Sequence, residues 1–219
     1  MSETAPVTAP TSKQIGSLVV EFDDTVLEPR PWTARQAEWA AELSPDLPDG
    51  PLLELCSGAG HIGLLAARLT GRDAVLVDAS EAACAFAESN AGQVRADGPE
   101  IAVRHGLMAE VLGDDEAFPL VLADPPYIPS DQVSVFPEDP TLAIDGGTDG
   151  LAIARECLAV AGRHLVAGGA LVLQLRDVEQ ARLLASESET VGLTGGEVRE
   201  ETGHGALLLL RRGPETPVG

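Results

Sequence analysis

Aromatic side chains are scarce in this chain of 219 residues, in which four Phe, two Trp and one Tyr amount to 3%. Hydrophobic residues nonetheless make up 44% of the chain, so its core must be built from Leu, Val, Ile and Ala. A core of this kind is typical of a sheet whose two faces are both covered by helices. The length suits one domain with a sizeable core.

Cysteine is also scarce, since Cys56, Cys84 and Cys157 are the three in the chain. An odd number without C-x-x-C spacing argues against a disulfide framework and against a zinc site, so no metal site is predicted. The apolar run near the C-terminus covers only residues 206–210, far too few to span a bilayer. The first residues lack the basic and apolar regions of a signal peptide. We therefore expect a cytoplasmic protein without membrane contact.

Positive charge is the third shortage. The chain has 14 Lys and Arg against 35 Asp and Glu, a formal net charge of −21. A field of that sign repels the phosphates of naked DNA or RNA. A local basic patch or a basic partner subunit would offset it, and acidity also serves solubility alone. The charge favours a protein or a small molecule over naked nucleic acid as the ligand, and leaves a partner subunit open.

Composition divides the chain into one folded region and two short ends. Residues 1–17 are rich in Thr, Ala, Pro and Ser, which is typical of a disordered arm. Residues 213–219 are expected to form a flexible tail. Residues 18–212 then form a single domain, in which residues 18–50 make an N-terminal hairpin and helix cap.

Two elements are predicted in this cap. Residues 18–27 are expected to form a strand pair around Asp23 and Asp24. A helix follows that runs to about Leu43. Thr33 is its predicted N-cap, and Gln36 stands three residues further on, at the spacing of a capping box.

Strands and helices alternate through the rest of the domain, which indicates an α/β fold with a mostly parallel sheet and helices on both faces. The last two strands are close in sequence and are expected to pair antiparallel through Gly203-His204-Gly205. Strands are predicted at residues 52–55, 74–77, 101–104, 120–123, 170–175, 197–201 and 206–211, and helices at residues 62–69, 80–91, 150–165 and 178–186.

The first of these strands leads into a glycine turn, Glu54-Leu55-Cys56-Ser57-Gly58-Ala59-Gly60. In an open α/β sheet, ligands bind beyond the carboxyl ends of the strands. Glycines allow the backbone to turn tightly and to approach a ligand closely. A lone G-x-G is a weak signal, because it also occurs in turns that bind nothing.

Asp78, at the end of the next strand, strengthens the interpretation of the turn as a cofactor site. A carboxylate at that place can accept hydrogen bonds from both hydroxyls of a ribose. The alternative is a charge at the N-terminus of the helix that Ser80 begins. Glu54 suits a cationic amino group better than the pyrophosphate of a dinucleotide. The two carboxylates Glu54 and Asp78 together favour S-adenosylmethionine over NAD as the cofactor, with Glu54 near the aminoacyl end of that cofactor.

The four residues Asp124-Pro125-Pro126-Tyr127 follow an apolar strand. The prolines fix the backbone and carry no N–H, so the carbonyl of Pro125 is a rigid acceptor and Asp124 is a second one. A planar NH2 group fits two such acceptors, and Tyr127 offers a face for stacking. We expect these residues to orient a nitrogen for methylation by a sulfonium cofactor. A proline-rich loop without function is the alternative.

Three segments, in this order, resemble the HemK/PrmC family of protein-glutamine N5-methyltransferases, which act on peptide-chain release factors. Residues 26–33 read V-L-E-P-R-P-W-T and are similar to the family's V-L-I-P-R-P-E-T. Residues 124–129 are similar to N-P-P-Y-I-P. Residues 142–151 read L-A-I-D-G-G-T-D-G-L and are similar to L-A-L-D-G-G-x-D-G-L. The resemblance covers residues 19–212, almost the whole folded part.

The resemblance implies a seven-stranded, Rossmann-like class I methyltransferase fold that uses S-adenosylmethionine. Together with the motifs above, it defines the expected site. The catalytic residues would be Asp124, Pro125, Pro126 and Tyr127. The cofactor-binding residues would be Glu54, Cys56, Ser57, Gly58, Gly60, Asp78, Ala79, Leu107, Met108 and Asp124. The substrate-binding residues would be Arg30, Trp32, Tyr127 and Glu138.

Four positions depart from the family pattern. Cys56 stands where the family has Gly, and Trp32 where it has Glu. Leu107 replaces an acid near the adenine, which Met108 is expected to cover instead. Asp124 replaces Asn, and an ionised Asp accepts hydrogen bonds but cannot donate them.

The acceptor of the methyl group stays open. The family's N-terminal helical domain, which docks the protein substrate, has no counterpart in these 219 residues. D-P-P-Y is also familiar from enzymes that methylate exocyclic amines of bases. A protein glutamine is the first hypothesis, and a small metabolite or a nucleobase amine is the second. The third is a non-catalytic cofactor-binding subunit. His61 is expected either to touch the cofactor carboxylate or to be a partly exposed first-turn residue.

Overall fold

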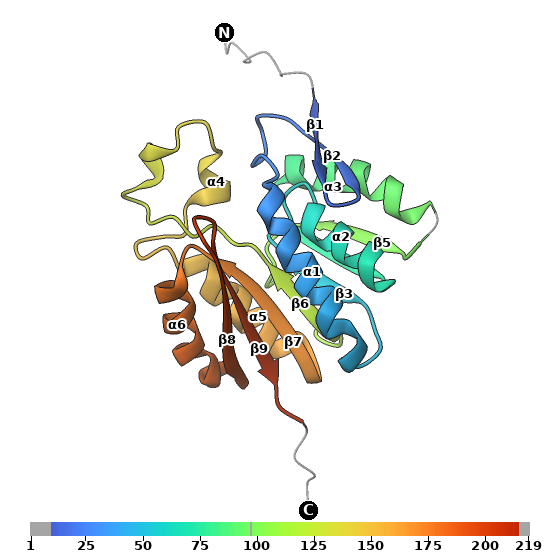
Figure 1. Cartoon of the computed structure of the whole chain (residues 1–219), viewed down its shortest axis with the longest axis vertical. Coiled ribbons are helices and arrows are strands. Elements are labelled where there is room, and N and C mark those ends of the chain that lie inside the picture. The colour runs from blue at the N-terminus through green and yellow to red at the C-terminus, as the bar shows by residue number, and fades with distance from the viewer. Residues whose placement is uncertain (1–9, 97, 215–219) are drawn as a thin grey trace, which may run out of the picture.

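The computed structural model describes residues 10–96 and 98–214, which are built around one seven-stranded sheet (Figure 1). The strand order is β5-β4-β3-β6-β7-β9-β8. Strands β3 to β7 run parallel, and β9 pairs antiparallel with both β7 and β8. This arrangement confirms the predicted fold. The strands are β3 Leu52–Leu55, β4 Ala74–Asp78, β5 Ile101–His105, β6 Phe118–Ala123, β7 Leu165–Leu175, β8 Leu193–Glu201 and β9 Gly205–Arg212.

Helices cover both faces of the sheet, because the central strands are apolar at nearly every position. Leu52 and Leu122 pack with α1, α2 and α3, whereas Leu53 and Val121 pack with α5 and α6 on the other face. Successive residues of a strand point to opposite faces, so an apolar strand of this kind must be buried on both. The helices are α1 Ala34–Leu43, α2 His61–Thr70, α3 Glu81–Arg95, α4 Thr141–Ile144, α5 Ala152–His164 and α6 Val178–Glu187. Short 3-10 turns lie at Pro31–Thr33, Ser44–Asp46, Val133–Val135 and Ser188–Val191.

A hairpin at the N-terminal end corrects part of the sequence analysis. β1 Thr11–Ile15 pairs antiparallel with β2 Leu18–Phe22, so the prediction of disorder was wrong for residues 10–17. The turn lies at Gly16, with a φ of 55°, and not at Asp23 and Asp24. Ile15 and Leu18 are 1% and 0% exposed, and their burial stabilises the hairpin. Residues 1–9 of the predicted arm and 215–219 of the predicted tail lie outside the described residues.

Thr33 is the N-cap residue of α1 and Leu43 its last residue, as predicted, but the capping box was wrong. The 3-10 turn Pro31–Thr33 leads directly into the helix, and the Thr33 side chain caps no backbone N–H. Gln36 is fully buried and reaches the sheet instead. Its Nε2 donates to the carbonyl oxygens of Ala123, at 2.9 Å, and Val172, at 2.8 Å. Because Ala123 ends β6, this contact ties α1 to the strand that leads into the D-P-P-Y motif.

Within the described residues, no helix is long and apolar enough to cross a membrane.

Candidate functional site

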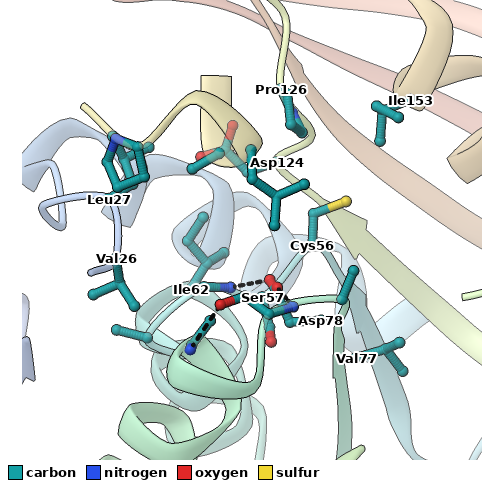
Figure 2. A pocket seen from close by; sticks show the side chains of 18 of the residues that line it. Val26, Leu27, Cys56, Ser57, Ile62, Val77, Asp78, Asp124, Pro126 and Ile153 are labelled. Atoms are coloured by element: carbon teal, nitrogen blue, oxygen red, sulfur yellow. Dashed lines mark hydrogen bonds between the residues drawn. The ribbon is translucent and has the colours of Figure 1, made fainter. Parts of the chain in front are cut away.

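A cavity of about 240 Å³ lies at the carboxyl ends of the parallel strands (Figure 2). Segments that follow four adjacent strands line it in the order of the sheet: residues 106–108 after β5, 78–80 after β4, 56–59 after β3, and Asp124 with Pro126 after β6. The segment around residues 25–30 and helix α4 complete its walls. Parallel strands that end together thus bring residues far apart in sequence into one pocket.

Most of the predicted site residues lie in this pocket, and several do not. Those that line it are Arg30, Cys56, Ser57, Gly58, Asp78, Ala79, Leu107, Met108, Asp124 and Pro126. Those that lie elsewhere are Trp32, Glu54, Gly60, Pro125, Tyr127 and Glu138. Sequence reasoning had weighed His61 without placing it in the site, but it is a lining residue. No cluster of three His, Cys, Asp or Glu side chains suited to a metal ion occurs within residues 10–96 and 98–214.

The glycine turn after β3 depends on left-handed backbone conformations. Gly58 and Gly60 have φ of 52° and 81°. A Cβ on Gly60 would lie 3.0 Å from the Leu76 side chain, whereas one on Gly58 would meet nothing within 4 Å. Gly60 is therefore needed for packing. Gly58 leaves the pocket wall open to a close approach.

Cys56 shares this left-handed conformation, with a φ of 57°, where the family has glycine. Its Sγ lies 4.0 Å from the Sγ of Cys157, which in turn lies 3.8 Å from the Sδ of Met108. The contact with Cys157 and burial raise the pKa of the Cys56 thiol well above its ordinary value. Cys56 therefore stays a neutral thiol, and its side chain lies beside Asp124 in the cavity wall (Figure 2).

Asp78 joins the turns that follow β3 and β4. Its Oδ2 accepts a hydrogen bond from the Gly58 amide at 2.8 Å, and its Oδ1 accepts one from the Ser80 amide at 2.8 Å. Burial raises the pKa of this carboxyl. Asp78 thus supports the local backbone and also borders the cavity. A role at the start of the helix after Ser80 is therefore compatible with a role in ligand binding.

Glu54 lies behind the turn and is fully buried. Neither carboxyl oxygen has a hydrogen-bond partner of normal geometry among the described residues. Burial raises its pKa well above the ordinary value, and the charges of Asp124 and Asp78 add to the rise, although the Gly63 amide lies close enough to lower the pKa in part. Gly63 of α2 lies directly against it, because a Cβ there would approach Oε2 to 2.4 Å. Without a positive charge nearby, such a carboxyl is held in its neutral form.

Asp124 follows β6 and lies half-buried in the cavity wall. Burial raises its pKa to about 7. Tyr127 is close enough that burial and the Asp124 charge raise the pKa of the phenol. A carboxyl with a pKa near neutrality in a pocket is a candidate for proton transfer.

The D-G-G-T-D-G segment packs its glycines directly against the backbone of the D-P-P-Y motif. A Cβ on Gly146 would lie 2.6 Å from the Pro126 carbonyl oxygen, and one on Gly150 would lie 2.5 Å from that of Tyr127. The Gly146 amide donates to the carbonyl oxygen of Ile128 at 2.8 Å. Two motifs that sequence alone showed as separate segments thus form one structural unit.

We expect Gly150→Ala to destabilise the protein more than Gly192→Ala. The two glycines have φ of 74° and 75°, so each substitution incurs the left-handed penalty of about 1–2 kcal/mol. A Cβ on Gly192 would meet nothing within 4 Å, whereas one on Gly150 would meet the Tyr127 carbonyl. Thermal unfolding of the two variants measures the difference. Equal melting temperatures would contradict the packing of the two motifs.

An ion pair that sequence reasoning missed lies beside the cavity. Arg30 Nη2 lies 3.1 Å from Oδ1 and 3.3 Å from Oδ2 of Asp139. Asp139 is largely buried and precedes Pro140 of the cavity lining, whereas the predicted Glu138 is exposed. The sequence F-P-E-D-P offered two adjacent carboxylates and no signal to choose between them.

Trp32 makes a different contact from the one expected. Its ring stacks on His204 in the β8–β9 turn, with centroids 4.2 Å apart and planes 13° apart. This contact joins the N-terminal cap to the last hairpin. Trp32 therefore has a structural partner, and it does not border the cavity.

Comparison with known proteins agrees with this geometry. A family model described as "Conserved hypothetical protein 95" matches residues 27–138. The chain is 34% identical over 204 residues to the release factor glutamine methyltransferase of Deinococcus radiodurans, covering 90% of this chain and 70% of the relative. The chain belongs to the release factor glutamine methyltransferase family. The resemblance found in the sequence is thereby confirmed.

Further comparisons show how much of its relatives' length this chain covers and which solved structure shares its fold. It is 31% identical over 192 residues to the release factor glutamine methyltransferase of Mycolicibacterium smegmatis, covering 85% of this chain and 66% of the relative. The chain thus spans about two thirds of the length of these two relatives. A solved methyltransferase from Pyrococcus furiosus shares the fold, with a TM-score of 0.66 at 18% identity and 90% coverage of each chain.

Proposed function

We propose that this chain transfers a methyl group from S-adenosylmethionine to the side-chain amide nitrogen of a protein glutamine. The observation that carries the proposal is the meeting of Asp124 and Pro126 with the glycine turn and Asp78 in one cavity. The family's relatives are named for glutamine methylation of release factors, and the same acceptor class is proposed here.

The residues of the cavity fit this cofactor. Leu107 and Met108 form an apolar end suited to a planar base. Asp78 borders the next section and suits a ribose. Two residues that line the cavity after β3 carry a polar atom buried without a partner, Ser57 Oγ and His61 Nδ1, and Glu54 carries two more behind the turn. Such atoms cost about 1–3 kcal/mol each when left unpaired, so a polar ligand end at this place would stabilise the site.

Bound S-adenosylmethionine would supply an electrophilic methyl group on a positively charged sulfur. The chain's own residues hold the acceptor. The Asp124 carboxyl would accept a hydrogen bond from one amide hydrogen and the carbonyl of Pro125 from the other, although Pro125 itself does not line the cavity. Neither Pro125 nor Pro126 has a competing N–H. The nitrogen loses one hydrogen as a proton when it gains the methyl group. The ionised Asp124 carboxylate can accept that proton, which an asparagine at this position cannot do.

Asp124 also favours a second candidate, methylation of an exocyclic amine on a nucleobase, because D-P-P-Y is familiar from such enzymes. The net charge of −21 opposes it.

The test incubates the purified protein with methyl-labelled S-adenosylmethionine and, separately, release factor, nucleic acid and extracted metabolites. We expect label in the release factor, at a glutamine located by mass spectrometry. Replacement of that glutamine should remove the label. Label only in nucleic acid would support the second candidate. Cofactor binding without label in any acceptor would overturn both.

Reversal of either charge in the Arg30–Asp139 pair should raise the KM for the acceptor about three- to tenfold, because the pair connects two segments that line the cavity. The double variant Arg30→Asp, Asp139→Arg should recover most of the loss. Glu88→Arg is the control, since it breaks a surface pair with Arg95 on α3. A double variant no better than the single ones would contradict the bridging role.

A further inference from the structure

His61 is the lining residue whose chemistry the proposed function has not used. It is the first residue of α2, directly after the glycine turn. Its Nε2 lies 2.9 Å from the hydroxyl oxygen of Thr33, which belongs to the segment before α1. His61 therefore connects the cofactor turn with the P-R-P-W-T segment.

The neighbouring groups determine where the hydrogens lie in the contact between Thr33 and His61. The Thr33 hydroxyl lies 2.7 Å from the carbonyl oxygen of Arg30, which can only accept, so the single hydroxyl hydrogen is donated there. The bond between Thr33 and His61 must then be donated by the ring. His61 consequently carries its hydrogen on Nε2, and burial lowers its pKa to about 4, so the ring is neutral at pH 7. Nδ1 is left with a free lone pair.

That lone pair has no partner within the described residues. Neither does the hydroxyl of Ser57, which belongs to the same turn and also lines the cavity. The ring nitrogen can only accept, and the hydroxyl can accept as well as donate. The ligand group that suits them is one that donates several hydrogen bonds, which describes an ammonium and not a carboxylate.

The order of the strands locates this turn relative to the cofactor. Asp78, after β4, lies on one side of it and Asp124, after β6, on the other. The aminoacyl end of a cofactor whose ribose lies at Asp78 would therefore fall above the turn after β3. Resting on the proposed function, we propose that His61 Nδ1 accepts a hydrogen bond from the α-ammonium of the cofactor, and that Thr33 fixes the tautomer required.

Under this proposal His61 is a specificity-determining residue and Thr33 is a positioning residue that acts through it. The alternative weighed from the sequence, a contact with the cofactor carboxylate, would need a hydrogen on Nδ1. The bond to Thr33 places that hydrogen on Nε2 instead.

Calorimetric binding of three thioether ligands separates these possibilities. The ligands are S-adenosylhomocysteine, its analogue without the α-amino group and its analogue without the α-carboxyl group. His61→Leu should weaken the two ligands that keep the amine by about tenfold or more, and leave the desamino analogue nearly unchanged. Thr33→Val should reproduce the pattern more weakly, and Thr33→Ser should restore wild-type binding.

Each other outcome contradicts the inference in a different way. Equal weakening of all three ligands would mean that His61 only shapes the wall. Weakening confined to the two ligands that keep the carboxylate would assign His61 to that group. Melting temperatures within a few degrees of wild type verify that the variants are folded. Failure of the wild-type protein to bind S-adenosylhomocysteine would overturn the proposed function itself, which distinguishes the two failures.

Discussion

An Asp124→Ala variant should lose about a hundredfold or more in kcat while it retains most of its affinity for the cofactor. The proposed function places the acceptor nitrogen at Asp124, and loss of one oriented catalytic hydrogen bond typically costs that much. Single-turnover transfer and calorimetric binding measure the two quantities. Full activity in this variant would contradict the assignment of the acceptor site.

Asp124→Asn separates the hydrogen bond from the charge. The carboxyl with its pKa of about 7 is protonated below that pH and ionised above it. If the carboxylate accepts the proton, wild-type kcat/KM should fall about tenfold per pH unit below pH 7, and the activity of the Asp124→Asn variant should not follow that curve. The charge of Asp124 in turn raises the pKa of Glu54, Cys56 and Tyr127. A wild-type profile that is flat between pH 5 and 8 would exclude proton transfer to Asp124.

The Asp124→Asn variant should be more stable than the wild-type protein at high pH. Since the folded pKa of Asp124 lies above the unfolded value, the folded state binds more protons between about pH 4 and 7. The free energy of unfolding therefore decreases as pH rises through that window. The Asp124→Asn variant escapes this loss, because its amide does not titrate. Its melting temperature should exceed that of wild type at pH 8 and approach it at pH 4.

Asp78→Ala should weaken S-adenosylhomocysteine binding by about a hundredfold, because two ribose hydroxyls would lose a charged acceptor. The variant also leaves the amides of Gly58 and Ser80 without their acceptor, which lowers stability as well. Asp177→Ala is the matched control. Asp177 accepts from the Gln180 amide at the start of α6 and does not line the cavity. If both variants lose stability equally and only Asp78→Ala loses ligand binding, the result would support the ribose role of Asp78. Unchanged ligand binding in both variants would contradict it.

The sequence predicted the sheet well, because the signals were local and uninterrupted. The strand at residues 52–55 matches β3, and Gly71 ends α2 with a φ of 72°. The hairpin at Thr11–Ile15 was missed because its residues are mostly polar, and Ile15 is buried only by tertiary contacts. Composition alone does not indicate such a strand.

The site was predictable to the extent that strand ends determine it. Asp78 and Asp124 follow strands whose neighbours in the sheet follow from the alternation of strands and helices. The contacts of Gln36, His61 and Asp139 were not predictable, because each depends on a partner 28 to 136 residues away. Such partners are set by packing, and no local spacing encodes them.

The antiparallel direction of β9 determines where the chain leaves the domain. Strand β9 runs toward the amino ends of the parallel strands, so its last residue lies at the edge where those strands begin (Figure 1). The cavity lies at the other edge, where they end. A reporter or affinity tag fused after residue 214 would therefore leave the cavity mouth free for an acceptor as large as a folded protein. Fusions at that end are the ones to use when measuring acceptor binding.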